Sequence, residues 1–270
     1  MPLVTRNGVP LHYEDVGRGP VIFFHTGGGG DGTMWQSAGY LDALSEYRCL
    51  LFDHRGHGRS GRPDDLRAHA IDEYVADVVA VLDAAGVEQC AMVGYSDGAR
   101  LIYKFAARHS GRVSAIVGIG GVSHPDEPSM RWRTELAHEV RTLGFRAWLE
   151  QMSAAESEPA PQWLLENLGS TPEDMFCLEL EGWAEGHTEC ADFPSIKAPT
   201  LIVCGELEDT DGASSLAVEA LPDGLAVVVP GFGHLQAFYR ADVTAPIVRE
   251  FLNRHMRVPG HPGIQPMSLP

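Results

Sequence analysis

Residues 90–108 decide the fold, and they read CAMV, GYSDG and ARLIYKFAAR in succession. The apolar run at 90–93 predicts a buried strand, and residues 101–108 predict a helix. Between them lies a G-x-S-x-G segment, Gly94 to Gly98, with Ser96 at its centre. A serine on such a strand-to-helix turn projects its hydroxyl above the edge of the sheet, and the glycines let backbone segments approach closely. This stretch therefore predicts a nucleophile at Ser96.

Strand-like and helix-like segments alternate on both sides of this turn. The helix expected at 71–85 shows apolar residues at i, i+3, i+4 and i+7, and Gly86 ends it. A short strand at 11–15 suits an opening hairpin. Further strands are expected at 21–25, 48–53, 113–119, 200–204 and 226–229, and further helices at 213–220 and 244–255. This alternation predicts an α/β fold with a mostly parallel central sheet flanked by helices.

The alternation is interrupted once, over residues 121–195. This segment contains several prolines, many Glu, Trp and Met residues, and helical pieces such as 131–144, but no apolar strand run. We expect a core made of 1–120 and 196–257, with 121–195 inserted as a helical cap or lid. The tail at 258–270 contains repeated prolines and is expected to be irregular.

Composition excludes several kinds of partner. The chain has 37 Asp and Glu against 20 Lys and Arg, a formal net charge of −17. Nucleic acids and anionic membrane surfaces attract basic proteins, so both are disfavoured. No run of about 18 apolar residues and no secretory leader is recognisable. Five widely spaced cysteines without a C-x-x-C predict buried thiols. We expect a cytoplasmic protein with no nucleic-acid or membrane partner, and the charge does not forbid a homodimer.

Three further motifs stand in the order of a known family. Residues 25–28 read HTGG after one predicted strand, and residues 52–60 read FDHRGHGRS after the next, similar to a D-x-R-G-x-G-x-S loop. Late in the chain, Gly233-His234 lies between a strand and the last expected helix. With the serine turn, these motifs make the chain resemble the α/β-hydrolase fold family, of the kind that carries a helical cap domain. The resemblance covers nearly the whole core.

The resemblance implies a serine nucleophile, a histidine base and an acid, in that chain order. Ser96 needs an adjacent base because a hydroxyl barely ionises near neutral pH, and His234 fits that role. The acid follows the strand at 200–204, where the family's register falls on Glu208, with Asp209 as the alternative. Asp211 lies further along the chain, and Asp126, after the preceding strand, is a fallback.

The oxyanion hole is expected to combine two backbone N–H groups. One belongs to Asp97, the residue after the nucleophile, and the other to Gly27 by register, with Gly28 as the alternative because Thr26 stands where relatives have glycine. The glycines at 27–30 do not indicate a phosphate site, since no G-K-[ST] follows. The Asp97 carboxylate either suits the start of a helix or, as in related amino-acid-ester hydrolases, meets a substrate ammonium.

These features predict a cofactor-independent serine hydrolase that cleaves a small ester or lactone through an acyl-enzyme. The alternatives are a C–C bond hydrolase of ring-cleavage products, an amino-acid-ester hydrolase and a non-catalytic binding module. We expect no cofactor and no metal, and interpret His54 and His57 as incidental and Asp53 and Arg55 as structural. Aromatic residues of the insertion are expected either to roof an acyl pocket or to form a small core of their own; they are Trp132, Trp148, Trp163, Phe176 and Trp183.

Overall fold

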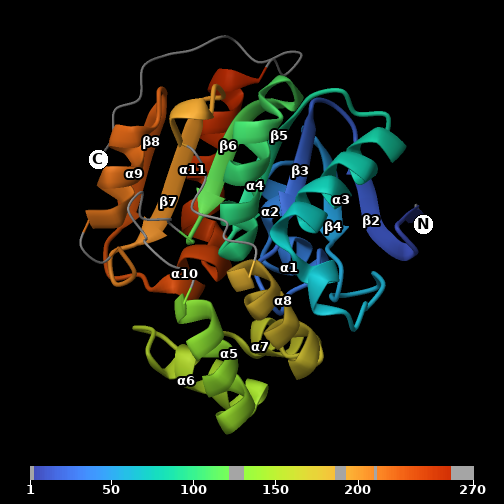
Figure 1. Cartoon of the computed structure of the whole chain (residues 1–270). Helices are drawn as coiled ribbons and strands as arrows, with labels where there is room; N and C mark the ends of the chain where they lie inside the picture. The colour runs from blue at the N-terminus through green and yellow to red at the C-terminus, as the bar shows by residue number, and fades with distance from the viewer. Residues whose placement is uncertain (1–2, 122–130, 186–192, 210–211, 257–270) are drawn as a thin grey trace.

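A central sheet of eight strands organises the computed structural model, which describes residues 3–121, 131–185, 193–209 and 212–256 (Figure 1). The first strand pairs antiparallel with the second, the second pairs antiparallel with β4, and all other neighbours run parallel. The predicted α/β fold with a mostly parallel sheet is therefore confirmed. In spatial order the strands are β1 (Leu3–Arg6), β2 (Val9–Gly17), β4 (Arg48–Asp53), β3 (Val21–His25), β5 (Cys90–Tyr95), β6 (Val113–Ile119), β7 (Thr200–Gly205) and β8 (Gly224–Val229).

Helices cover both faces of the sheet. Successive strand residues point to opposite faces, so Phe23 and Phe24 are both fully buried but belong to two different hydrophobic clusters. One cluster packs against α3 (Ile71–Ala84), α4 (Asp97–Arg108) and α9 (Ala213–Ala220). The other packs against α1 (Thr33–Ser37), α2 (Tyr40–Ala43), α10 (His234–Tyr239) and α11 (Ala241–His255). Short 3₁₀ turns are η1 (Leu66–His69), η2 (Ser110–Arg112) and η3 (Phe193–Ser195).

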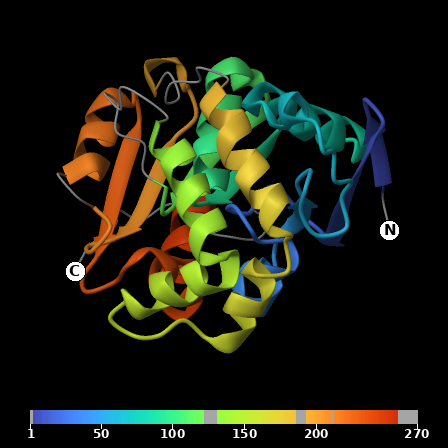
Figure 2. The same ribbon diagram turned by 60° about the horizontal axis from the view of Figure 1, so that its bottom comes forward.

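Among the residues described between β6 and β7, there are four α-helices, and we call residues 131–185, which contain them, the insertion. They are α5 (Arg131–Leu143), α6 (Phe145–Ala154), α7 (Gln162–Leu168) and α8 (Glu173–Glu185). They gather below the sheet in Figure 1, and Figure 2 brings them forward, with α5 and α8 packed side by side. The insertion therefore lies beyond one end of the strands.

Several boundaries differ from the sequence expectation. Strand β5 runs on to Tyr95 because Tyr95 pairs with Ile119 of β6, so the nucleophile follows the strand without a spacer. Helix α10 was not expected at all: His234 opens this short helix, separate from α11. Asp126, Asp211 and the tail at 258–270 lie outside the described residues.

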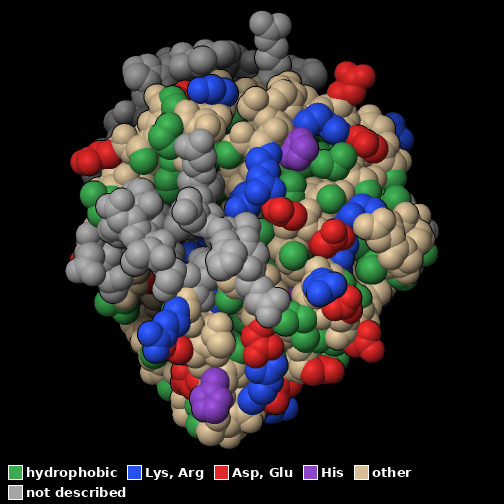
Figure 3. All heavy atoms as spheres, viewed as in Figure 1, with side chains coloured by type: hydrophobic (Ala, Val, Ile, Leu, Met, Phe, Trp, Pro, Cys, Tyr) green, Lys and Arg blue, Asp and Glu red, His purple; other side chains and the backbone are tan. Residues whose placement is uncertain are grey.

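Surface charge, cysteine state and helix length can be compared with the expectations drawn from composition. Acidic and basic side chains are interspersed over the face shown in Figure 3. Cys49, Cys90, Cys177 and Cys204 are buried free thiols. Among the described helices, none combines the length and the apolar character that crossing a bilayer requires.

Candidate active site

The serine turn is strained and tightly packed. Ser96 has φ +56° and ψ −122°, a conformation that non-glycine residues rarely adopt, so its neighbours hold it in place. A Cβ at Gly94 would lie 2.5 Å from the carbonyl oxygen of Gly98, and one at Gly98 would lie 2.4 Å from that of His25. Only glycine fits at either position. Strand β5 and helix α4 can therefore meet closely enough to present the Ser96 hydroxyl between them.

His234 links the serine to a carboxylate. Its Nε2 lies 3.0 Å from Ser96 Oγ, and its Nδ1 lies 2.5 Å from Glu208 Oε2. Since the carboxylate accepts from Nδ1–H, Nε2 is left as the acceptor for the serine proton. The other carboxylate oxygen of Glu208 accepts from the N–H of Gly205, 3.0 Å away, which fixes its orientation. The three side chains that the sequence singled out are thus brought together.

The charges around His234 favour its protonated form. Burial is the largest single effect and lowers the pKa of His234, but the Glu208 carboxylate opposes it through its charge and its hydrogen bond. The carboxylates of Glu156 and Asp97 add to the effect of Glu208, so the pKa of His234 lies above its ordinary value. An imidazolium that forms when the serine loses its proton is therefore stabilised by the site itself.

Asp209, the alternative acid, is engaged elsewhere. Its carboxylate accepts from the backbone N–H of Ser214 at 2.8 Å and from the Ser214 hydroxyl at 2.7 Å. Asp209 therefore holds the first turn of α9, while the adjacent Glu208 faces the histidine. Neighbouring residues on this turn point in different directions, so the structure favours Glu208 of the two.

The expected oxyanion donors flank the nucleophile. A Cβ at Gly27 would lie 2.7 Å from Ser96 Cβ and 3.3 Å from its Oγ, so this glycine packs directly on the serine. The N–H groups of Gly27 and Asp97 find no hydrogen-bond acceptor among the described residues. Gly28 is instead covered by Phe176, whose ring lies 2.6 Å from the position of a Cβ. The geometry thus points to Gly27 over Gly28 as the second donor.

The Asp97 carboxylate forms an ion pair with an arginine of the insertion. Arg133, fully buried on α5, donates from Nη1 to Asp97 Oδ2 at 3.0 Å and from Nη2 to Oδ1 at 2.5 Å. Its guanidinium makes cation–π contacts with Trp132 and Trp183, 4.5 and 4.7 Å from the centroids of their rings. Each oxygen of Asp97 thus accepts from Arg133, so this carboxylate pairs with a cation of the chain itself.

The insertion also supports the histidine. The Glu156 carboxylate accepts from the backbone N–H of Leu235 at 2.8 Å and of Gln236 at 3.3 Å. These are the two N–H groups that follow His234 in α10. Ser157 donates to the side-chain oxygen of Gln236 at 2.8 Å, and the same oxygen accepts from the N–H of Gly233 at 3.2 Å. No motif marks these residues in the sequence, and Glu156 is a site residue that sequence reasoning missed.

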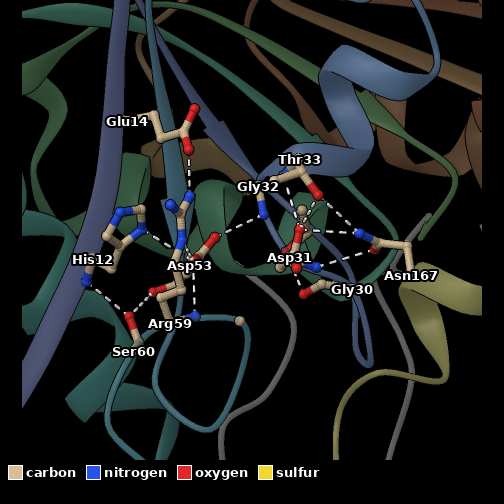
Figure 4. Close-up of polar contacts among 12 residues, drawn as sticks. His12, Glu14, Gly30, Asp31, Gly32, Thr33, Asp53, Arg59, Ser60 and Asn167 are labelled. Carbon is tan, nitrogen blue, oxygen red and sulfur yellow. Dashed lines mark hydrogen bonds and ion pairs between the residues drawn. The ribbon is translucent and has the colours of Figure 1, made fainter. Parts of the chain in front are cut away.

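The segment that directly follows the glycine loop, residues 31–33, is held from two sides. In Figure 4, Asn167 of α7 reaches Asp31 and Thr33, with its Nδ2 3.0 Å from Asp31 Oδ1. On the other side, Asp53 accepts from the N–H of Gly32 at 2.9 Å. Asp53 also contacts His12, 3.0 Å from its Nδ1. The expected structural role of Asp53 agrees with these contacts.

Arg55 and the aromatic residues of the insertion complete the surroundings. Arg55 binds Asp77 of α3 through two hydrogen bonds of 2.7 Å, which agrees with the structural role expected for it. Phe176 stacks on Phe145 at 4.5 Å between centroids and lies against Trp148 at 5.7 Å. Since the Phe176 ring also covers Gly28, this aromatic group forms an apolar wall beside the serine. Trp183 is fully buried in the same hydrophobic cluster as residues of β3 and α3, so it packs into the core of the sheet and not into a separate core of the insertion.

A serine turn, a histidine and a carboxylate above the end of a parallel sheet define an α/β enzyme of the hydrolase type. The chain belongs to the α/β hydrolase fold family, whose model matches residues 19–241. A non-heme haloperoxidase of Rhodococcus erythropolis is 37% identical, over 93% of this chain and 99% of that protein.

Two solved structures show how varied the chemistry on this architecture is. The bottromycin epimerase BotH is 25% identical with a TM-score of 0.80, covering 93% of this chain and 97% of that one. The enol-lactonase of Burkholderia xenovorans LB400 is 23% identical with a TM-score of 0.76, covering 94% and 100%. The fold is therefore shared, and the activity has to be argued from the residues of the site.

Proposed function

We propose that this protein is a serine hydrolase that cleaves a small, uncharged carboxylic ester or lactone through Ser96, His234 and Glu208. The observation that carries the proposal is the position of His234, with Ser96 Oγ 3.0 Å from one ring nitrogen and Glu208 2.5 Å from the other. This chemistry is carried out by the chain's own side chains.

The reaction starts when Nε2 of His234 takes the Ser96 proton and Oγ attacks the acyl carbon. The N–H groups of Gly27 and Asp97 receive the negative charge on the acyl oxygen, which is typically worth about 3 kcal/mol for one donor. The imidazolium then returns its proton to the leaving alkoxide. Water, deprotonated by the same nitrogen, opens the acyl-enzyme, and the serine recovers its proton.

The surroundings support an uncharged substrate. Glu208 and Glu156 place negative charge beside the histidine, which disfavours an anionic acyl group. Asp97 is neutralised by Arg133, which removes a partner for a cationic one. The wall of Phe145, Trp148 and Phe176 favours an apolar acyl chain. We further propose that the insertion acts as a lid, since it contributes both that wall and the arginine.

The test is labelling with a fluorophosphonate probe, followed by mass spectrometry of the modified peptide. We expect one adduct on Ser96, none in Ser96→Ala and much less in His234→Ala, while Asp209→Asn labels like the wild type. A panel of uncharged aryl esters, lactones and vinylogous diketones then compares C–O with C–C cleavage. The proposal is refuted if folded wild-type protein neither takes the label nor turns over any ester or lactone. Faster cleavage of the diketones would replace the ester with a carbon–carbon bond.

A further inference from the structure

Three buried side chains that play no part in the triad converge beneath the glycine loop. His54 and His57 belong to the loop that follows β4, and Glu179 comes from α8 of the insertion. The side chains of both histidines are fully buried, and that of Glu179 is 1% exposed. Glu179 Oε2 lies 3.4 Å from His54 Nε2 and 3.3 Å from His57 Nε2, and one ligand atom from each residue lies within 4.8 Å of the others.

Two of these atoms have no hydrogen-bond partner. His54 Nε2 and Glu179 Oε2 make no hydrogen bond to any residue that the structure describes. A buried polar atom without a hydrogen bond raises the free energy of the folded state. Two such atoms beside each other therefore indicate that a ligand binds between them. The Nε2 atoms of His12 and His25 are also buried and unpaired, but among the described residues neither belongs to a cluster of three potential metal ligands. The buried His69, in contrast, has its Nδ1 2.9 Å from the Tyr74 hydroxyl and its Nε2 2.8 Å from the carbonyl of Pro63.

The spacing is that of ligands around one small cation. Zinc binds imidazole nitrogen and carboxylate oxygen at about 2.0–2.2 Å, so ligands at tetrahedral angles lie about 3.3–3.5 Å apart. Both distances from the carboxylate oxygen fall at this spacing. The far ring nitrogens are also oriented: His57 Nδ1 donates to the carbonyl of Arg55 at 3.1 Å, and His54 Nδ1 lies 3.4 Å from the Thr26 hydroxyl. Such outer contacts direct the Nε2 lone pair toward a metal.

We propose that His54, His57 and Glu179 form a buried binding site for a divalent transition metal, with Zn²⁺ as the preferred ion. Two imidazoles and one carboxylate suit zinc and its neighbours in the first transition row, whereas Ca²⁺ and Mg²⁺ need an all-oxygen shell. The site ties α8 of the insertion to the core loop, so its role is to fasten the two together. This proposal replaces the interpretation of His54 and His57 as incidental.

One hydrogen bond connects the proposed metal site to the glycine loop at 27–30, so metal binding is expected to change the conformation of that loop. The N–H of Gly29 donates to His57 Nε2 at 2.9 Å, so a metal that takes this nitrogen displaces the Gly29 N–H. Gly29 has φ +85° and is two residues from Gly27, the proposed oxyanion donor. Zinc is therefore expected to reduce turnover by rearranging this loop. This last step rests on the proposed function, whereas metal binding does not.

The experiment measures metal binding directly, on the full chain without a histidine tag. Metal-free protein is incubated with ZnSO₄, both in the folded state and during refolding from urea, so that slow entry into the buried site is not limiting. After desalting, zinc is counted by mass spectrometry, and the affinity is obtained by competition with a chromophoric chelator. We expect one equivalent of zinc with a Kd below about 1 µM.

The variants separate this site from surface histidines. Glu179→Gln keeps the shape of the side chain and removes the charge, and we expect its zinc affinity to fall by about 100-fold or more. His54→Gln serves if Glu179→Gln does not fold, as judged by circular dichroism. His138→Gln removes an exposed histidine of α5 and should bind like the wild type. The proposal is overturned if the wild type retains no zinc by either route, or if folded Glu179→Gln binds it equally well.

Discussion

Replacing Glu156 is predicted to slow the enzyme, although this residue touches neither the nucleophile nor the histidine ring. Its carboxylate receives the two backbone N–H groups that follow His234, at 2.8 and 3.3 Å. These bonds hold the start of α10 and hence the direction of the imidazole. Glu156→Ala removes both acceptors, whereas Glu156→Gln leaves one oxygen for one of the two N–H groups.

The expected size of the effect follows from those two bonds. Removing a side chain that accepts backbone N–H groups at the start of a helix typically costs about 1 kcal/mol, within a range of about 0.5–2. If about 1.4 kcal/mol of positioning is lost in Glu156→Ala, kcat/KM falls about tenfold. Glu156→Gln keeps about half of the interaction, so we expect a loss of about threefold.

The pH dependence of kcat/KM gives a second test. Here the Glu156 variants are expected to stay active at lower pH than the wild type, although their maximum rates are lower. His234 must be neutral to take the serine proton, so activity is present above its pKa and is lost as the pH falls through it. Burial lowers the pKa of His234, but the charges of Glu208, Glu156 and Asp97 raise it overall. Removing the Glu156 charge lowers this pKa. The acid limb of kcat/KM therefore moves to lower pH in both variants, even though their maximum rates fall.

The assay follows initial rates of ester hydrolysis against pH for the wild type, Glu156→Gln and Glu156→Ala. Glu158→Gln is the matched control, because Glu158 lies on the same loop and is exposed. Circular dichroism checks that each variant is folded. The reasoning is refuted if both Glu156 variants keep the wild-type maximum and the wild-type acid limb, or if Glu158→Gln changes the profile as strongly.

Three further predictions concern the acid, the buried ion pair and the glycine loop. Glu208→Ala should lower kcat by about 10³-fold or more. Asp209→Ala should leave kcat within about threefold and lower the melting temperature. Equal losses of kcat in the two variants would contradict the assignment of Glu208 as the acid. Arg133→Met removes the two short bonds to the buried Asp97 carboxylate and leaves it the longer ion pair with Arg100, at 3.8 Å. Urea denaturation should therefore show a loss of about 3 kcal/mol, the lower end of the range for breaking a buried pair; adding Asp97→Asn should restore at least half of it, and no recovery would count against the ion pair. Gly27→Ala places a methyl group 2.7 Å from the Cβ of the nucleophile and should reduce kcat more than it raises KM; steady-state kinetics with wild-type values would exclude this glycine from the oxyanion hole.

The core and the serine, histidine and acid candidates are accessible from sequence because their signals are local. Apolar runs of strand length mark β3, β4 and β6 with the same bounds that the structure has. Ser96 and His234 follow strands within short glycine-containing segments, so a few neighbouring residues suffice to single them out. The choice between Glu208 and Asp209 needed the structure, because adjacent residues on a turn differ only in direction.

The residues that the insertion contributes to the site cannot be predicted from short sequence motifs. Arg133 and Glu156 lie in amphipathic or loop segments, where a charged residue usually faces solvent. What distinguishes them is a partner far away in the chain, Asp97 for one and the start of α10 for the other. Glu179 is similar, because two histidines of a core loop give no hint of a third group on α8. Such pairings depend on how the insertion docks, which no short motif encodes.

The position of the insertion between β6 and β7 also sets the order in which the site can assemble during synthesis. Ser96 and His234 are 138 residues apart, a separation that a ribosome covers in roughly 7–28 s at about 5–20 residues per second. Throughout that interval the nascent chain contains the serine turn without its base. From the completion of β6 at residue 119 to that of β7 at residue 205, β6 also lacks its partner strand. Such an unpaired strand edge is open to association with other chains, so this interval is when the protein most needs a chaperone. The same delay keeps the serine chemically inert until almost the whole chain has been made.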